Sequence, residues 1–376
     1  MPELYGRHYT REDLLRRVGR LDQVAGIEPC VLDDGLARGT RALRVSTGAG
    51  LDFTVLPDRC LDIPRASYNG RSLCWHDSPG VVGPQFYEPE GNGFLRSFFG
   101  GLVTTCGLRN SGSPCTVDGE YYPMHGRIGN LPASEVSYGA TWQGDEYVLW
   151  IEGTVRETRL FGENMTLRRR ITTSLGATSL RIENTVRNEG WSDEGHMILF
   201  HMNPGFPLLD DGARLCVDPL DVRPRDTEAQ KGLDVYDRFD APHPDFREQV
   251  FILDLRPDAE GYTSAAIVNE RLDGGLGLRL RFRKDQLPWM MKWRQLGEGA
   301  YVLGLEPSNC PTIEGRAEAV KRGTLPILKP GEERRYDIDV EALTALSLLP
   351  YIPPCRYTGS VAVFSRTPAN PFCLQV

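Results

Sequence analysis

Two residues of the chain stand where apolar stretches end and the sequence turns, and their side chains could move protons. His201 follows the apolar run MILF (197–200) and precedes the turn-forming Asn-Pro-Gly (203–205). A side chain at the end of a buried strand is held rigidly yet can face a cleft, as a proton donor requires. A hydrogen-bonded core histidine would show the same pattern, so both interpretations stay open.

Glu306 ends the strand-like run AYVLGLE (300–306), directly before Pro307. A carboxyl group in apolar surroundings can have a raised pKa, which suits a general base. The alternative is a glutamate at the rim of a sheet. An acid, a base and a polarising group are the minimum for proton transfer on a small neutral molecule.

A second histidine, His125, lies in YYPMHGRIGN (121–130). Gly126, which follows it, lets a ligand approach the backbone closely. The alternative is a surface turn that happens to contain a histidine. His196 has no such turn after it, and we assign it a structural role.

Aromatic and cationic residues precede Glu306 in LPWMMKWRQLG (287–297). Aromatic faces pack on apolar patches such as the C–H groups of a sugar ring. Trp293 and Arg294 are therefore candidate sugar contacts, although the same residues could belong to the core. Asp210 could accept a hydrogen bond from a sugar hydroxyl or form a turn with Asp211.

Several other chemistries find no support in the sequence. The chain has no Gly-x-Ser-x-Gly nucleophile motif and no Walker A motif. The glycine-rich segment 81–110, with its interleaved aromatic residues, lacks the strand and helix that a dinucleotide-binding loop needs. The nine cysteines include no Cys-x-x-Cys pair and no zinc-like spacing, so we expect reduced thiols, no metal and no cofactor. A glycosidase stays open, because two carboxylates can meet from anywhere in a chain.

The elements that must position these residues are strands. The 40 Gly and 27 Pro are spread evenly, which is typical of many short strands and turns. Apolar and polar residues alternate in 42–59, 146–158 and 165–190, which predicts antiparallel strands with one dry face. The best helix candidate is 11–24, whose apolar face would consist of Leu14, Leu15, Val18 and Leu21.

Length and charge limit the class of protein. The formal net charge of the 376-residue chain is −8, which gives no electrostatic reason to expect nucleic acid. The charged N-terminus and the lack of an 18-residue apolar run predict a cytoplasmic protein without a membrane partner. We expect one domain over 1–345 and an extended tail over 346–376, packed on the domain or on a neighbouring subunit. The long polar connection 220–250 is of a kind that often carries function or forms a rim.

In its motifs the chain resembles the aldose 1-epimerase (galactose mutarotase-like) superfamily and, more narrowly, the DUF4432 branch. The motifs are LPDRCLDIPRASYNGRSLCW (56–75), MHGRIGN (124–130), FHMNPGFPLLDDG (200–212), GLEPSN (304–309) and LKPGEERRYDIDVEAL (328–343). They occur in the expected order across roughly residues 40–345. The resemblance implies an all-β fold: a large antiparallel β-supersandwich with a short N-terminal helix, whose concave face binds a sugar.

The resemblance also implies roles for particular residues. In mutarotases a glutamate takes the proton of the anomeric hydroxyl, one histidine protonates the ring oxygen, and a second histidine holds and polarises the sugar. Glu306, His201 and His125 match these three catalytic positions in that order. Arg59 and Arg127 match positions that bind hydroxyls or brace the site. The other candidate substrate contacts are Asn203, Asp210, Trp293 and Arg294.

The chain departs from the family pattern in two places. The family motif His-x-Tyr-Phe-Asn is here His201-Met202-Asn203-Pro204-Gly205, and Arg127 replaces the second of two glycines that usually follow the first histidine. An arginine in the pocket would favour an acidic or phosphorylated sugar.

The sequence therefore predicts a sugar mutarotase whose partner is a small-molecule carbohydrate, and a homodimer is left open. One alternative is a carbohydrate epimerase or isomerase that acts at a carbon centre. Another is a sugar-binding protein without catalysis, against which the presence of all three candidate catalytic residues argues.

Overall fold

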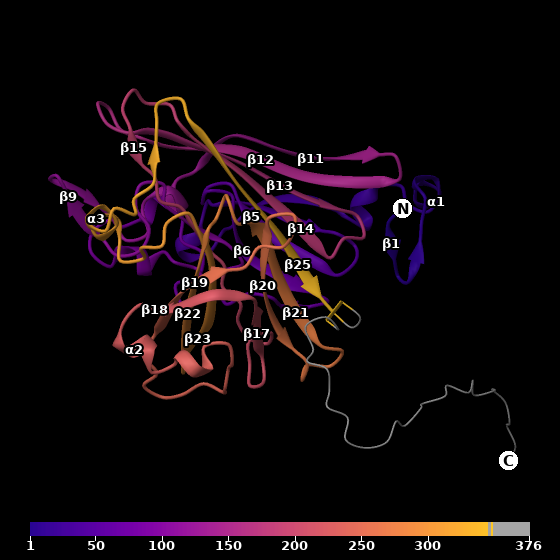
Figure 1. The fold of residues 1–376 in the computed structure, drawn as a ribbon. Coiled ribbons are helices and arrows are strands. Elements are labelled where there is room, and N and C mark those ends of the chain that lie inside the picture. The colour runs from indigo at the N-terminus through magenta and orange to yellow at the C-terminus, as the bar shows by residue number, and fades with distance from the viewer. Residues whose placement is uncertain (345–346, 349–376) are drawn as a thin grey trace, which may run out of the picture.

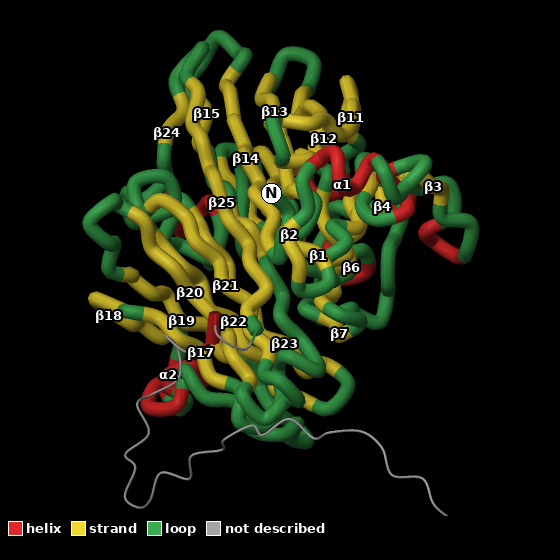
Figure 2. The backbone as a smooth tube through the Cα atoms, turned by 90° about the vertical axis from the view of Figure 1, so that its right-hand side faces the viewer, coloured by secondary structure: helices red, strands yellow, loops and turns green. Residues whose placement is uncertain are grey.

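The computed structural model describes residues 1–344 and 347–348, so the tail expected over 346–376 lies outside the described residues except for 347 and 348. Three antiparallel sheets of eight, six and five strands make up most of the described chain. Figure 1 shows β11, β12 and β13 running across the upper part of the molecule, with β18, β19, β22 and β23 below them. Figure 2 shows that helical segments are few and short beside the strands. The predicted all-β, antiparallel fold with a short N-terminal helix is confirmed.

The eight-stranded sheet contains the strands that the sequence predicts most clearly. In order its strands are β11 (Ala133–Gln143), β12 (Glu146–Thr158), β13 (Asn164–Ser174), β14 (Ser179–Asn188), β25 (Glu333–Leu343), β21 (Leu276–Arg283), β20 (Tyr262–Asn269) and β17 (Arg214–Val217). Every second residue of β12, β13 and β14 is buried in the main core, as the alternating pattern predicts.

The six-stranded sheet is apolar on both faces. In order its strands are β18 (Pro219–Pro224), β19 (Gln249–Leu255), β22 (Trp289–Gly297), β23 (Ala300–Ser308), β16 (Leu199–His201) and β8 (Thr104–Cys106). Phe251 and Leu253 of β19 pack into the main core. Val250 and Ile252 point the other way, into a second cluster with Phe94, Phe98 and Met291. Loops cover that second face, and the candidate site lies there.

The five-stranded sheet consists of β3 (Gly26–Val31), β4 (Arg41–Ser46), β5 (Leu51–Leu56), β6 (Asp62–Tyr68) and β7 (Arg71–Ser72). The short strands are β1 (Glu3–Leu4), β2 (Arg7–His8), β9 (Cys115–Val117), β10 (Glu120–Tyr122), β15 (Glu194–Gly195) and β24 (Ile327–Leu328). The α-helices are α1 (Arg11–Leu15), α2 (Thr227–Gln230) and α3 (Arg316–Lys321). The 3-10 helices are η1 (Leu21–Gln23), η2 (Gly35–Ala37), η3 (Pro84–Phe86), η4 (Gly93–Arg96), η5 (Ile128–Asn130) and η6 (Leu233–Val235). No helix of the described residues is long and apolar enough to cross a membrane.

The N-terminal helix is shorter than the predicted 11–24. A capping box between Thr10 and Asp13 starts α1, but the helix ends at Leu15 and only Leu14 is buried. Val18 and Gly19 follow, and both residue types have low helix propensity. With one buried side chain, packing does not compensate for this low propensity, and the chain forms turns and the separate η1 instead.

A fully buried ion pair joins the three sheets. Arg169 of β13 lies 2.7 Å from the Asp62 carboxylate of β6, and it also donates to the Thr105 hydroxyl of β8 at 2.7 Å. The Thr105 backbone N–H and hydroxyl donate in turn to Asp62. One guanidinium therefore fixes the positions of three strands from three sheets.

Replacement of Arg169 by Met should reduce the free energy of unfolding by about 3–5 kcal/mol, because it leaves the Asp62 carboxylate buried without its partner. Urea unfolding of the full chain measures this change. The matched control is R168M, which alters the neighbouring, exposed arginine and should change stability by at most about 0.5 kcal/mol. Equal losses in the two variants would contradict the role given to the pair.

Candidate active site

A cavity of about 410 Å³ lies over the outer face of the six-stranded sheet. Its apolar lining residues are Trp75, Phe94, Leu95, Phe98, Met124, Val250, Trp293, Ala300 and Ile313. Its polar lining residues are Asp77, Ser113, His125, His201, Arg225, Glu248, Gln295 and Glu306. A larger cavity of about 860 Å³ lies against the five-stranded sheet and contains none of the candidate residues. Within residues 1–344 and 347–348, no three His, Cys, Asp or Glu side chains group as metal ligands.

Glu306 and His201 meet at the base of this cavity. They project from the neighbouring strands β23 and β16, and His201 Nε2 lies 3.2 Å from Glu306 Oε1. Only 2% of Glu306 and 6% of His201 are exposed. Burial raises the pKa of Glu306 well above its usual value. Burial, with the nearby His125, lowers the pKa of His201 to about 3. Both shifts favour a neutral carboxyl group beside a neutral imidazole.

Asn203 decides which nitrogen of His201 carries the proton. Its Nδ2 donates to the backbone carbonyls of Gly101 and His201, so its Oδ1 is left to accept from His201 Nδ1. The neutral imidazole is then protonated at Nδ1, and the lone pair of Nε2 faces Glu306. Glu306 Oε1 has no hydrogen-bond partner among the described residues, and Nε2 of His201 lies close to it at 3.2 Å. With both groups neutral, the pair carries one transferable proton, on the Glu306 carboxyl group.

His125 lies beside this pair in the opposite tautomer. The Gly112 backbone N–H donates to His125 Nδ1 at 3.3 Å, so the neutral ring carries its proton on Nε2. Burial lowers the pKa of His125 to about 4. The His125 ring centroid lies 5.7 Å from that of His201 and 4.8 Å from that of Phe94. Gly112 has φ +87°, and a Cβ there would lie 1.6 Å from the Ile313 carbonyl oxygen, so only glycine fits.

Trp293 and Arg294 are adjacent residues of β22, but only Trp293 faces the cavity. Trp293 lines the cavity, its ring centroid is 5.4 Å from that of His201, and its Nε1 donates to Glu248 at 3.0 Å. Arg294 points to the opposite face of the sheet, as the next residue of a strand must. There its guanidinium donates to Gln249 and to the Val235 carbonyl. Of these two candidate contacts, Trp293 therefore lines the cavity and Arg294 does not.

Four other candidate contacts also lie outside the cavity lining: Asn203, which holds His201 from behind, and Arg59, Arg127 and Asp210. Arg59 is fully buried and donates to the carbonyls of Gly129, Val82 and Ser97, so it braces the loops around the site. Arg127 lies close enough to Tyr87 to lower that residue's pKa, although burial dominates there and raises it. Asp210 accepts from the Asp211 backbone N–H in a turn.

Most of the lining residues are not among the candidates drawn from the sequence, and they include Trp75, Asp77, Phe94, Phe98, Arg225, Glu248 and Gln295. Two signals in the sequence pointed to some of them. Phe94 and Phe98 are among the aromatic residues interleaved with glycine in 81–110. Arg225 and Glu248 belong to the polar connection 220–250, and long connections of this kind often carry function.

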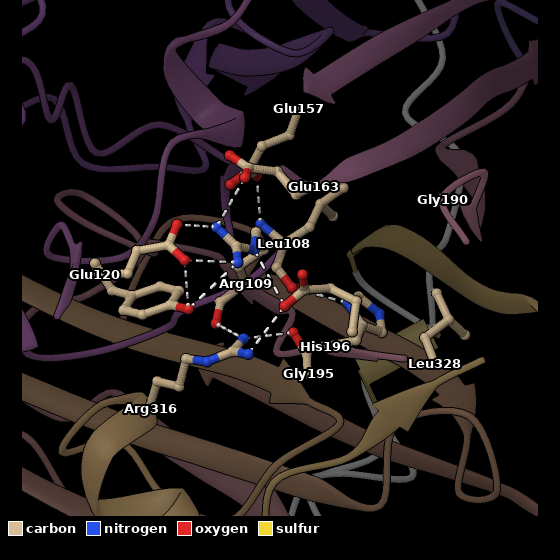
Figure 3. A network of polar contacts seen from close by, with 12 residues as sticks. Leu108, Arg109, Glu120, Glu157, Glu163, Gly190, Gly195, His196, Arg316 and Leu328 are labelled. Carbon is tan, nitrogen blue, oxygen red and sulfur yellow. Dashed lines mark hydrogen bonds and ion pairs between the residues drawn. The ribbon is translucent and has the colours of Figure 1, made fainter. Parts of the chain in front are cut away.

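Figure 3 shows a network of charged residues around Leu108 and Arg109. This network fixes the loop 107–113, from which Gly112 contacts His125. The Arg109 guanidinium is largely buried and pairs with Glu120, with Glu163 at 3.2 Å and with Glu194 at 3.1 Å. The network therefore holds the backbone that orients His125, although it does not line the cavity.

Comparisons with known proteins identify the family and the fold. A family model described as a domain of unknown function (DUF4432) matches residues 37–342. No curated protein matches the chain. Among the solved structures, the chain is similar to a candidate aldose 1-epimerase from Klebsiella pneumoniae. The two sequences are 28% identical, and the structures superpose with a TM-score of 0.82 over 88% of each chain.

Two more distant structures share the fold. A galactose mutarotase-like protein from Clostridium acetobutylicum is 13% identical, with a TM-score of 0.59 over 86% of this chain and 99% of that chain. A galactose 1-epimerase from Lactobacillus acidophilus is 13% identical, with a TM-score of 0.55 over 85% and 99%. The fold is therefore the galactose mutarotase-like one, as the sequence resemblance implies.

Glu157 makes the stability of the charged network depend on pH. It accepts from the Leu108 backbone N–H at 2.9 Å, and burial raises its pKa to about 7. The folded state therefore binds more protons than the unfolded state between about pH 4.5 and 7, and the free energy of unfolding falls as pH rises through this window. The loss attributable to Glu157 is at most about 3 kcal/mol.

The variant E157Q keeps an acceptor for Leu108 but cannot ionise, so its free energy of unfolding should fall less than that of the native chain between pH 5 and 8. Urea unfolding at four pH values measures the two slopes. The exposed control E298Q should keep the native slope. An unchanged slope in E157Q would show that this carboxyl does not titrate in the folded state as described.

Proposed function

Because the chain belongs to the DUF4432 family of domains of unknown function and has the galactose mutarotase-like fold, we propose that it is a sugar mutarotase. It would be an aldose 1-epimerase-like isomerase that interconverts the anomers of a monosaccharide. The observation that carries the proposal is the 3.2 Å contact between the buried side chains of Glu306 and His201, which line a cavity with aromatic walls.

The proton count of the pair fits this reaction. Ring opening removes one proton from the anomeric hydroxyl and adds one to the ring oxygen, and closure reverses both transfers. Glu306 and His201 hold one proton between them, so together they can accept one and donate one and finish with the same total. No net exchange of protons with solvent is needed.

In this proposal Glu306 is the base and His201 the acid. The reactive form is a carboxylate beside an imidazolium, which forms from the neutral pair when one proton moves from Oε1 to Nε2. The hydrogen bond from His201 Nδ1 to Asn203 raises the pKa of the histidine and so favours this form. Asn203 acts here as a positioning residue behind His201.

His125 and Trp293 complete the proposed site. The lowered pKa of His125 keeps it neutral, so it presents Nε2–H as a hydrogen-bond donor to a sugar oxygen instead of competing as an acid. Trp293 offers an aromatic face for the C–H groups of the sugar ring. Arg59 supports the surrounding loops through backbone carbonyls.

The test is one-dimensional NMR of anomeric exchange in D₂O, over a panel of free, acidic and phosphorylated sugars. The native protein should accelerate exchange of at least one sugar without loss of any carbon-bound proton signal. Both E306Q and H201N should lower that rate by about 10²–10⁴-fold, the usual contribution of a general acid or base. The controls E298Q and H243N change exposed residues of the same types and should retain the native rate.

Three results would redirect the assignment. Deuterium incorporation at a sugar carbon identifies a carbon-centre epimerase or isomerase. Binding without acceleration of any sugar identifies a binding protein. Full activity in a folded E306Q or H201N removes that residue from the mechanism.

Gly304 gives a second test, because it makes room for Glu306. It lies two residues before Glu306 on β23, and a Cβ there would lie 2.2 Å from Glu306 Oε1 and 3.0 Å from Trp293 Cβ. G304A should push the carboxyl away from His201 and lower the anomerisation rate by roughly 10–100-fold. The fold should survive, since the atom displaced is the end of a side chain.

Anomerisation rate and Tm of G304A are compared with those of G19A, where a Cβ would meet nothing within 4 Å. A native rate in G304A would mean that the position of the Glu306 carboxyl does not limit the reaction.

A further inference from the structure

Carboxyl groups outnumber cations among the described residues that line the cavity, and the one cationic side chain is already paired. Arg225 is the only Arg or Lys among the described residues that line it, and the lining histidines are kept neutral by burial. The Arg225 guanidinium is already engaged, with Asp226 at 2.8 Å and Glu248 at 3.1 Å. Asp77 and Glu306 add two further carboxyl groups to the same lining.

Glu248 holds two parts of the cavity wall together. One of its carboxylate oxygens accepts from Arg225, and the other accepts from Trp293 Nε1 at 3.0 Å. Glu248 directly precedes β19, where Gln249 pairs with Arg294 of β22. It therefore stands beside Trp293 and Gln295, the two residues of β22 that line this part of the cavity.

The lining offers several hydrogen-bond acceptors to a ligand. The Gln295 Oε1 atom is buried and has no hydrogen-bond partner among the described residues, and Asp77 and Glu248 add carboxylate oxygens. Sugar hydroxyls can donate to all of these groups, whereas a phosphate dianion or a carboxylate can only accept. The phosphate or carboxylate oxygens of an anionic sugar could not form hydrogen bonds with these acceptors. They would also place a negative charge beside Glu248 and Asp77.

We propose that the cavity takes a neutral sugar and excludes sugar phosphates and uronates, and that Glu248 determines this specificity. The proposal deepens the function proposed above and rests on it. Glu248 acts by neutralising Arg225 and by repelling a second anion, a repulsive element of the kind that sets specificity. The proposal differs from the sequence-based expectation of an acidic or phosphorylated sugar, which rested on Arg127, a residue that lies outside the lining.

The test measures binding, so that it does not depend on catalysis. Titration calorimetry at fixed ionic strength compares D-glucose and D-galactose with their uronates and 6-phosphates. The native protein should bind at least one free sugar, and at least tenfold more tightly than the two anionic derivatives of that sugar. E248Q should reduce this preference at least tenfold, because it releases Arg225 and removes one negative charge.

Two further variants serve as controls. R225Q removes the cation and leaves Glu248, so it should keep or widen the preference for the neutral sugar, and E298Q should leave it unchanged. The Tm of each variant establishes that it is folded.

The proposal is overturned if an anionic derivative binds as tightly as its parent, if no free sugar binds, or if E248Q keeps the native preference. If the preference is as expected but no sugar is anomerised faster, the proposed reaction fails and the specificity assignment stands.

Discussion

The buried ion pair between Arg169 and Asp62 is the interaction on which the arrangement of the sheets depends. It joins β13, β6 and β8, and Thr105 of β8 completes it. β8 pairs with β16 in a register that sets Thr105 opposite Phe200 and Thr104 opposite His201. A charge pair without access to water has to be satisfied completely, which allows little freedom in the geometry around it. The position of His201 therefore follows from a contact on the far side of its own sheet.

Burial, which holds the sheets together, also sets the chemistry of the site. The second apolar cluster covers the outer face of the six-stranded sheet and keeps water from Glu306 and His201. In such surroundings a carboxylate and an imidazolium are each unfavourable alone, so the two groups share one proton. Asn203 and Gly112 fix the tautomers of the two histidines from behind, and Arg225 and Glu248 of the lining form an ion pair with each other. Uncharged groups at Glu306, His201 and His125, beside an arginine that is already paired, suit a ligand that is itself neutral.

Much of the fold could be predicted because the strands of the eight-stranded sheet have one dry face, and residues 146–158 and 165–190 show the corresponding alternation. The three candidate catalytic residues could be selected from the sequence because each stands where an apolar run ends or a turn begins. The binding residues were harder to predict, because both faces of the six-stranded sheet are apolar. No pattern in the sequence shows that Trp293 faces the cavity and Arg294 the core. Arg225 directly follows β18 and Glu248 directly precedes β19, so the two meet only through the pairing of these strands.

The central claim is that Glu306 and His201 hold a single proton in a dry site. Its most direct test is ¹⁵N NMR of the histidine side chains from pH 5 to 8, with His201 assigned by the signals lost in H201N. The account predicts that Nδ1 of His201 is protonated throughout and that the ring does not titrate in this range, consistent with the direction of its pKa shift. A His201 ring that titrates near pH 6.5, or one that carries its proton on Nε2 alone, would contradict the account.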